Sequence, residues 1–203
     1  MKTFTQYLDE MTHAAYGDYT KNVSQYLQDV SRFIINKKWT RLTTINGLEL
    51  YRLTERNKRN YLIGKFNTQK DGSPFEVYTR MTLEVDSESS QLFNKIFYNV
   101  NLVATQSGMQ GSGLAKSLYQ YLVEVEGLLI LGDAVQYFGA RRLWSKISKM
   151  STVVVDILDI ANGEVIERDV TLSHGDLDHE FDPRVWSDDH LTYHIRPLLQ
   201  KLI

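Results

Sequence analysis

The chain has 203 residues, of which 42% are hydrophobic and 24% are charged, and its formal net charge is −2. This is the composition of a globular protein, and the small net charge argues against a dedicated nucleic-acid binder, whose phosphate contacts need a strong surplus of Lys and Arg. The chain contains no cysteine, which excludes disulfides, zinc–thiolate sites and cysteine nucleophiles within it. We find neither a signal-peptide core nor a run of roughly 20 apolar residues, so we expect a cytoplasmic protein without a membrane segment.

The first 38 residues predict a pair of helices. Phe4, Tyr7, Leu8 and Met11 follow the i, i+3, i+4, i+7 spacing of one helix face. Apolar residues of the segment 23–34 continue that spacing. We therefore expect residues 1–38 to form an N-terminal helical extension.

From Trp39 the hydrophobic period changes from helical to alternating. Alternation predicts strands in the segments 48–51, 61–66, 75–85 and 97–105, with breaks at Asp71-Gly72 and at 87–91. Three basic residues fall within the segment 55–60, between two of these strands, and predict an exposed hairpin tip rather than a nucleic-acid patch. This half of the chain is expected to be an antiparallel meander.

Beyond residue 105 helices alternate with strands. A glycine-rich turn at Gly108–Gly113 precedes an amphipathic helix over 114–125, and the wholly apolar run 128–131 predicts a strand buried on both faces. A second helix is expected over 140–147 and a closing hairpin over 153–170. The order of elements predicts an α/β fold with a mixed, mostly antiparallel sheet flanked by helices.

The glycine-rich turn is the segment that indicates chemistry. Glycines before a helix let several backbone N–H groups converge at the positive end of the helix dipole, which suits a phosphate or pyrophosphate. A P-loop requires lysine after the last glycine, where this chain has Leu114. A dinucleotide fingerprint requires a third glycine, where this chain has Lys116. Both of these phosphate-binding patterns therefore fail.

A third pattern fits. The run from Gln110 to Ala115, Gln-Gly-Ser-Gly-Leu-Ala, resembles the acyl-coenzyme A signature of the GNAT N-acetyltransferase superfamily, Gln/Arg-x-x-Gly-x-Gly/Ala. The later run Leu143-Trp144-x-Lys146-Ile147 resembles a helix ending of phage-encoded members. The resemblance covers residues 97–150 well and 40–96 by strand order. It implies a GNAT-type sheet over an acyl-CoA-binding domain at 39–170, between the extension 1–38 and a C-terminal tail, 171–203, packed on or near the domain.

Membership of this superfamily implies that acetyl, or another short acyl group, passes directly from coenzyme A to a primary amine. Acetyl-CoA would be the co-substrate, and the acceptor amine would belong to a small molecule or a protein. Residues 102–104 would hold the pantetheine through backbone groups, and backbone N–H groups of 110–115 would bind the pyrophosphate. Lys116 follows as a solvated first-turn residue or a phosphate contact. The implied cofactor-binding residues are Leu102, Val103, Ala104, Gln110, Gly111, Ser112, Gly113, Leu114, Ala115 and Lys116.

The catalytic groups depart from the family pattern. The tyrosine that often protonates the leaving thiolate falls at Trp144, which has no acidic proton and reads as a core residue. Tyr137 falls at a nearby family position and could supply the missing hydroxyl, or be an ordinary helix residue. The strand 97–105 has no carboxylate, so Glu84 and Asp86 on the preceding strand are the candidates for the general base, with a polar strand end as the alternative reading.

Other interpretations stay open at this point. The acidic and His-containing segment 173–182 predicts a solvated loop or a selector for a cationic amine, and no metal site is expected there. The N-terminal helices could cover the sheet, form a homodimer contact or grip a macromolecular acceptor. The alternative functions are a catalytically inactive GNAT-fold binding or interaction protein and, in third place, a nucleotide-binding module.

Overall fold

The computed structural model describes residues 39–66, 75–106, 108–132, 138–173, 185 and 194–202. The expected N-terminal helices, Tyr137 and the segment 174–182 lie outside these described residues. Among the residues described, no helix is long and apolar enough to cross a membrane.

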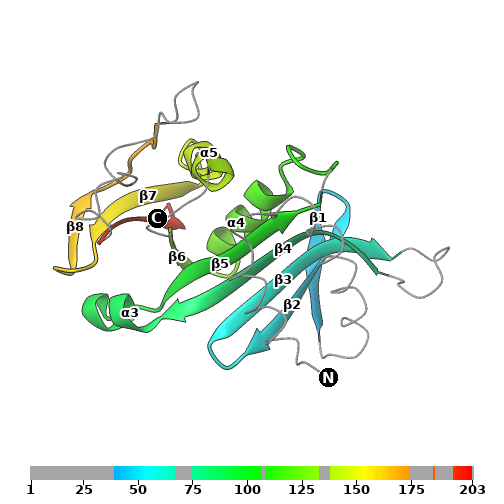
Figure 1. Ribbon diagram of the computed structural model, residues 1–203, viewed down its shortest axis with the longest axis horizontal. Helices are drawn as coiled ribbons and strands as arrows, with labels where there is room; N and C mark the ends of the chain where they lie inside the picture. Colours follow the sequence, from blue (N-terminus) through cyan, green and yellow to red (C-terminus); the bar gives the residue numbers. More distant parts are fainter. Residues whose placement is uncertain are drawn as a thin grey trace. The chain divides into compact units, whose positions relative to one another are not determined.

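Nine strands and three helices make up the described residues (Figure 1). Their bounds are β1 Thr40–Ile45, β2 Leu48–Glu55, β3 Lys58–Phe66, β4 Phe75–Asp86, α3 Ser87–Phe93, β5 Phe97–Thr105, α4 Leu114–Glu124, β6 Leu129–Leu131, α5 Phe138–Ile147, β7 Val153–Asp159, β8 Glu164–Glu167 and β9 Ile195–Lys201. The strands pair in the order β1-β2-β3-β4-β5-β6-β9-β7-β8. β5 and β6 are parallel, whereas β1–β2, β6–β9, β7–β9 and β7–β8 are antiparallel. The predicted α/β class with a mixed sheet is therefore confirmed.

The chain divides into two compact units, and the long strands β4 and β5 pass through both. Within the described residues, the first unit contains 39–55, 59–82 and 102–114. The second contains 56–58, 83–101 and 115–202. Each unit has its own buried residues.

In the first unit, β3 and β4 are buried along most of their length rather than on alternate residues. Five consecutive residues of β3, from Asn60 to Gly64, are buried. A Cβ on Gly64 would lie 2.1 Å from the carbonyl oxygen of Glu76 and 2.7 Å from the ring of Phe75. The close approach of β3 to β4 therefore requires glycine at this position.

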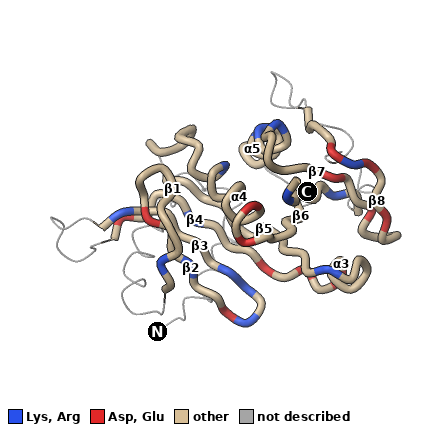
Figure 2. Tube along the Cα trace, turned by 180° about the vertical axis from the view of Figure 1, so that it is seen from behind, with Lys and Arg blue, Asp and Glu red and all other residues tan. Residues whose placement is uncertain are grey.

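The tip between β2 and β3 carries the basic residues that the sequence placed there. β2 ends at Glu55 and β3 begins at Lys58, so the turn consists of Arg56 and Asn57, both exposed. Figure 2 shows Lys and Arg gathered around this turn. The predicted exposed hairpin tip is confirmed.

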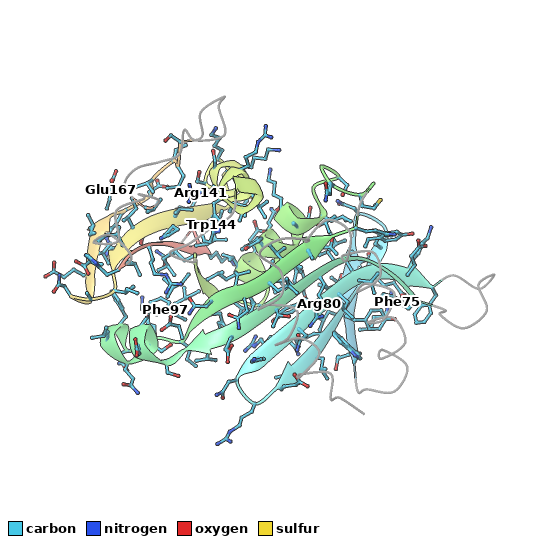
Figure 3. All side chains as sticks on the ribbon, in the orientation of Figure 1. Phe75, Arg80, Phe97, Arg141, Trp144 and Glu167 are labelled. Carbon is cyan, nitrogen blue, oxygen red and sulfur yellow. The ribbon has the colours of Figure 1, made fainter. Side chains whose placement is uncertain are left out.

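In the second unit, α4 and α5 bury apolar faces that the sequence predicted in part. Leu118 and Leu122 of α4 are fully buried as predicted, whereas Val125, which was expected on the same face, lies after the end of the helix and is 67% exposed. Tyr119, which was not predicted to be on that face, is 2% exposed. Trp144 of α5, labelled in Figure 3, is 1% exposed. Its ring meets that of Tyr119 edge to face, with the ring centroids 6.0 Å apart. Trp144 is therefore a core residue, as its sequence context predicted.

β9 is an element that the sequence analysis did not predict. It pairs with β7 over seven residues, from Ile195 opposite Asp159 to Lys201 opposite Val153. Its sequence contains Arg196 and Pro197, and proline is disfavoured inside a sheet because it has no N–H to donate. Pro197 has no N–H, but its carbonyl oxygen takes part in hydrogen bonding, because it accepts a bond of 2.8 Å from the N–H of Gly132.

The short helix α3 was also missed. The carboxylate of Asp86 caps its start by accepting a hydrogen bond of 2.9 Å from the N–H of Ser89. Asn94 ends the helix in a left-handed conformation, with φ of 50°. The segment 87–91, which the sequence showed only as an interruption of alternation, is thus a capped helical turn.

Candidate functional site

β5 leads from the core of the sheet to the glycine-rich turn. Its parallel register with β6 covers Phe97 to Asn99. At its other end, in the first unit, Ala104 is buried, while Leu102 and Val103 are half-buried. The N–H of Gln106 donates to the carbonyl oxygen of Tyr78 at 2.8 Å. This bond to β4 fixes the point at which the chain leaves the sheet.

Backbone hydrogen bonds join Gln106, Met109 and Ser112 in succession. The N–H of Met109 donates to the carbonyl oxygen of Gln106 at 2.9 Å, and the N–H of Ser112 donates to that of Met109 at 3.2 Å. The hydroxyl of Ser112 donates to the same Met109 oxygen at 2.6 Å. These bonds give the turn a defined shape from local contacts alone.

Three glycines in this turn take backbone conformations that other residues rarely adopt. Gly108, Gly111 and Gly113 have φ of 87°, 82° and 83°. Within the part of the chain that the structure describes, no atom lies within 4 Å of a Cβ built on any of the three. The backbone of the turn is therefore open to the approach of a ligand.

α4 begins at Leu114, immediately after the last of these glycines. The first N–H groups of any α-helix have no intrahelical acceptor. Gly113 has no side chain with which to cap them, and the Ser112 hydroxyl is engaged with Met109. The first turn contains no acidic residue and contains Lys116, so no carboxylate of that turn offsets the positive end of the helix dipole. The arrangement suits an anion.

The predicted cofactor residues therefore occupy three kinds of position. Leu102, Val103 and Ala104 form the last part of β5, and the residues from Gln110 to Gly113 are exposed in the turn. Leu114 is 2% exposed and anchors the start of α4, whereas Ala115 and Lys116 are half-buried in its first turn. The predicted run is thus continuous along the end of a strand, a turn and the start of a helix.

Glu84, the candidate base, lies near the end of β4 in the second unit. Its Oε2 accepts a hydrogen bond of 2.5 Å from the amide of Asn101 and lies 3.6 Å from the Nζ of Lys58. Its side chain is 38% exposed, so the ion pair with Lys58 is a weak, solvent-screened one. The Glu84 carboxylate is held in place and still reaches water.

Asp86, the other acidic candidate, is used structurally. In addition to capping α3, it accepts a hydrogen bond of 2.6 Å from the amide of Asn99 and lies 3.5 Å from Arg196. Desolvation by burial raises the pKa of Asp86, but hydrogen bonds from Ser89 and Asn99 and the charge of Arg196 together lower it below its ordinary value. A carboxylate held in its charged form by these partners is a poor proton acceptor.

Arg196 organises the polar core of the second unit. Its Nε donates to the carbonyl oxygen of Gly132 and its Nη2 to the side-chain oxygen of Asn99, both at 2.6 Å. Together with Asp86, these contacts connect β4, β5, the end of β6 and β9. Sequence reasoning missed this cluster because its members are 64 and 97 residues apart in the chain.

A second buried polar cluster lies in the first unit. Arg80 of β4 is fully buried and donates to the side-chain oxygens of Asn60, at 3.2 Å, and Thr82, at 3.3 Å (Figure 3). Thr82 donates in turn to Asn60 at 2.9 Å. The alternation along β4 put Arg80 on the face opposite Val77, Met81 and Leu83, so its burial was not predicted.

The described residues contain no group of three or more acidic, His or Cys side chains that could hold a metal ion. Tyr119, one of the two tyrosines of α4, is fully enclosed, and desolvation by burial raises its pKa far above the ordinary value, which makes it a poor proton donor. Of the two acidic candidates, Glu84 is therefore the one whose carboxylate still reaches water, because its side chain is 38% exposed and that of Asp86 is 12% exposed.

Comparison with known proteins finds no protein-family model that matches the sequence and no matching curated protein. A solved structure of a proposed acetyltransferase of the GNAT family from Bacteroides thetaiotaomicron is similar over 73% of this chain, with 17% sequence identity and a TM-score of 0.33. This chain spans 64% of the length of that protein. A TM-score of 0.33 is too low for the likeness to carry a conclusion about fold or activity.

Proposed function

We propose that this chain is an N-acyltransferase of the GNAT type, which moves an acetyl or other short acyl group from coenzyme A to a primary amine by direct transfer. The observation that carries the proposal is the open turn at Gly108–Gly113, which leads into a helix start that no side chain of Ser112 or Gly113 caps. A pyrophosphate is the ligand that this combination of free N–H groups and positive dipole favours.

We propose that successive parts of the cofactor contact successive segments of the chain. The backbone of Leu102, Val103 and Ala104 would meet the pantetheine amides. The N–H groups of the segment 110–115 would meet the pyrophosphate, apart from that of Ser112, which donates to Met109. Lys116 would add positive charge at the same end of α4. Support comes from the three positive-φ glycines, because a side chain at those positions would be strained and would occupy the space that a phosphate needs.

Acetyl-CoA supplies an acyl group on a sulfur leaving group. The amine attacks the thioester carbonyl and forms a C–N bond, and the C–S bond then breaks. The amine nitrogen loses a proton in this process, and the thiolate of coenzyme A gains one. Glu84 is proposed to receive the proton from the ammonium, which is compatible with its partial exposure. Tyr137 is proposed to donate the proton to the thiolate, because Trp144 cannot.

Substitution of these two residues tests their roles. We expect Glu84→Gln and Tyr137→Phe each to lower the rate constant for transfer by about 100-fold, the lower end of what a positioned acid or base contributes. The dissociation constant for acetyl-CoA should not change, because neither side chain is assigned to the cofactor. Single-turnover kinetics together with calorimetry separate these quantities. An unchanged rate constant would remove the residue from the mechanism.

A catalytically inactive binding protein is the second candidate. The observations that favour it are the enclosed Trp144 at the position where the family has a tyrosine and the engagement of Glu84 by Asn101 and Lys58. This candidate predicts binding of acetyl-CoA without release of free coenzyme A in the presence of any amine. A panel of small amines and lysine-containing peptides, monitored for free thiol, discriminates between the two.

The first experiment is thermal unfolding with acetyl-CoA, coenzyme A, ATP or buffer. A ligand at about 100 times its dissociation constant stabilises the folded state by roughly 2.7 kcal/mol, which is a readily visible shift. We expect a shift with both coenzymes and none with ATP. A shift with ATP alone would favour a nucleotide-binding module, and no shift with either coenzyme would overturn the proposed function.

A further inference from the structure

Gln106 contains a buried polar atom that no protein group satisfies. Its backbone is fixed at both ends, by the bond from its N–H to Tyr78 and by the bond from Met109 to its carbonyl oxygen. Its side-chain oxygen, Oε1, is buried and accepts no hydrogen bond from the part of the chain that the structure describes. The residue lies in the first unit, directly after β5 and two residues before Gly108, where the open turn begins.

A buried acceptor without a donor is destabilising, so folded proteins rarely retain one without a reason. The atoms beyond Gln106 along the chain are those of the open turn, where a Cβ on Gly108 would meet nothing within 4 Å among the described residues. We propose that Gln106 is a ligand-binding residue whose Oε1 accepts a hydrogen bond from the pantetheine part of a bound acyl-coenzyme A. This inference rests on the proposed function.

The chemistry of coenzyme A restricts which of its groups can fill this role. A pyrophosphate at neutral pH offers acceptors and no donor, so it cannot satisfy Oε1. The pantetheine offers two amide N–H groups and a hydroxyl. The adenosine donors lie on the opposite side of the pyrophosphate from the pantetheine. The class of donor at Gln106 is therefore a pantetheine amide or hydroxyl.

The position of Gln106 in the chain agrees with this assignment. The proposed pantetheine contacts are at 102–104 and the proposed pyrophosphate contacts at 110–115. Gln106 lies between them, so the donor it meets is the pantetheine group nearest the pyrophosphate. Gln106 would then favour coenzyme A over nucleotides that carry a pyrophosphate but no pantetheine.

The test compares two ligands on the wild type and on Gln106→Met, which has a similar length but no amide. The ligands are coenzyme A and 3′-phosphoadenosine 5′-diphosphate, which retains the pyrophosphate and lacks the pantetheine. We expect Gln106→Met to weaken coenzyme A by about 3- to 10-fold, the effect of one neutral hydrogen bond, and to leave the nucleotide unchanged. Calorimetry gives both dissociation constants, and Gln106→Leu repeats the test if the methionine variant does not fold.

Two further measurements separate a binding role from a structural one. Because Gln106→Met removes an unsatisfied buried acceptor, its melting temperature without ligand should be higher than that of the wild type without ligand. Gln91→Met, at an exposed position of α3, controls for the general effect of this exchange and should leave both ligands unaffected.

The ratio of the two affinities decides the outcome. A variant that binds coenzyme A and the nucleotide in the wild-type ratio, whether both are retained or both are weakened, would overturn the inference. A wild type that does not bind coenzyme A would overturn the proposed function as well, and this is seen before any variant is made. The two failures are therefore distinguishable.

Discussion

Two helices of this chain begin in opposite ways. α3 starts at Asp86, whose carboxylate accepts the N–H of Ser89, so the protein itself supplies the negative charge at the helix start. α4 starts after Gly113, which has no side chain, and its first turn contains no acidic residue. Both helices have a positive N-terminal end with N–H groups that lack an intrahelical acceptor. A carboxylate of the chain accepts one of these N–H groups in α3, whereas the first turn of α4 contains no carboxylate. The contrast teaches that a helix start indicates a ligand only when the chain leaves it unsatisfied.

The largest expected effect comes from placing a carboxylate at the open helix start. Gly113→Glu sets a negative charge against the pyrophosphate, and such a repulsion amounts to about 4 kcal/mol at 4 Å and an effective dielectric constant of about 20. We expect the affinity for acetyl-CoA to fall by at least about 100-fold, as calorimetry would measure.

Gly47→Glu is the matched control for this substitution. Gly47 has φ of 77°, and a Cβ there meets nothing within 4 Å among the described residues, so both variants carry the same backbone strain. We expect each variant to lose about 1–2 kcal/mol of stability from that strain and only Gly113→Glu to lose the cofactor. Wild-type affinity in a folded Gly113→Glu protein would contradict the assignment of the turn.

The next largest effect is expected from removal of the carboxylate that caps α3. Asp86→Ala removes the cap of α3 and the negative partner of the buried Arg196 guanidinium. The breaking of a buried ion pair costs about 3–5 kcal/mol, and urea unfolding of the variant should show a loss in this range. Asp86→Asn keeps an acceptor for the Ser89 N–H and should lose less. Equal stability of wild type and Asp86→Ala would show that the cluster around Arg196 is not a stabilising feature.

Asp86 is also expected to have a smaller effect on how the stability of the folded protein changes at acid pH. The folded-state pKa of Asp86 is lowered from the ordinary value of 3.8, so the unfolded chain binds its proton first. The contribution of Asp86 to stability is therefore present above pH 3.8 and is lost as the pH falls through the lower folded-state pKa. Urea unfolding between pH 5 and pH 2 should show a steeper fall for the wild type than for Asp86→Asn. Parallel curves would contradict the charged role of Asp86.

The smallest effect concerns the lysine in the first turn of the open helix. Lys116→Ala removes one half-buried positive charge near the proposed pyrophosphate, an interaction of about 0.3–1 kcal/mol. We expect a loss of about 2- to 5-fold in acetyl-CoA affinity, which diminishes as salt is added. Lys95→Ala, at an exposed position after α3, serves as the control for net charge. An affinity equal to that of the control would make Lys116 a solvated residue.

Several elements could be predicted because their signals are local. The apolar spacing that predicted α4 and α5 reappears as their buried faces, with Leu118, Leu122 and Ile147 fully buried. The turn between β7 and β8 was predicted from Asn162-Gly163, and Gly163 has φ of 70°. The glycines of the turn before α4 likewise take the conformations for which glycine is needed. The predicted cofactor residues, by contrast, stay a prediction, because the geometry suits an anion without identifying one.

Other features could not be read from local pattern. Helix α3 is only seven residues long, too short for an apolar period to appear, and its caps are side-chain contacts. The segment of β9 contains Arg196 and Pro197, which local propensity assigns to a loop, and its two leucines form too short a run to predict a strand. The fully buried Arg80 has one partner on its own strand, Thr82, and one on another strand, Asn60, which is 20 residues away and which no local pattern identifies.

The sequence by itself determined the α/β class, most of the strands and the helix-starting turn, because periodicity and glycine conformation act over a few residues. The tertiary structure alone decided the place of β9 between β6 and β7, and with it the contacts of Arg196 to Gly132 and Asn99. It also decided which acidic residue remains accessible, since Asp86 is engaged by partners on α3, β5 and β9 while Glu84 reaches water. Such choices arise from contacts between segments far apart in the chain, whose free energies depend on burial and on partners that no local pattern contains.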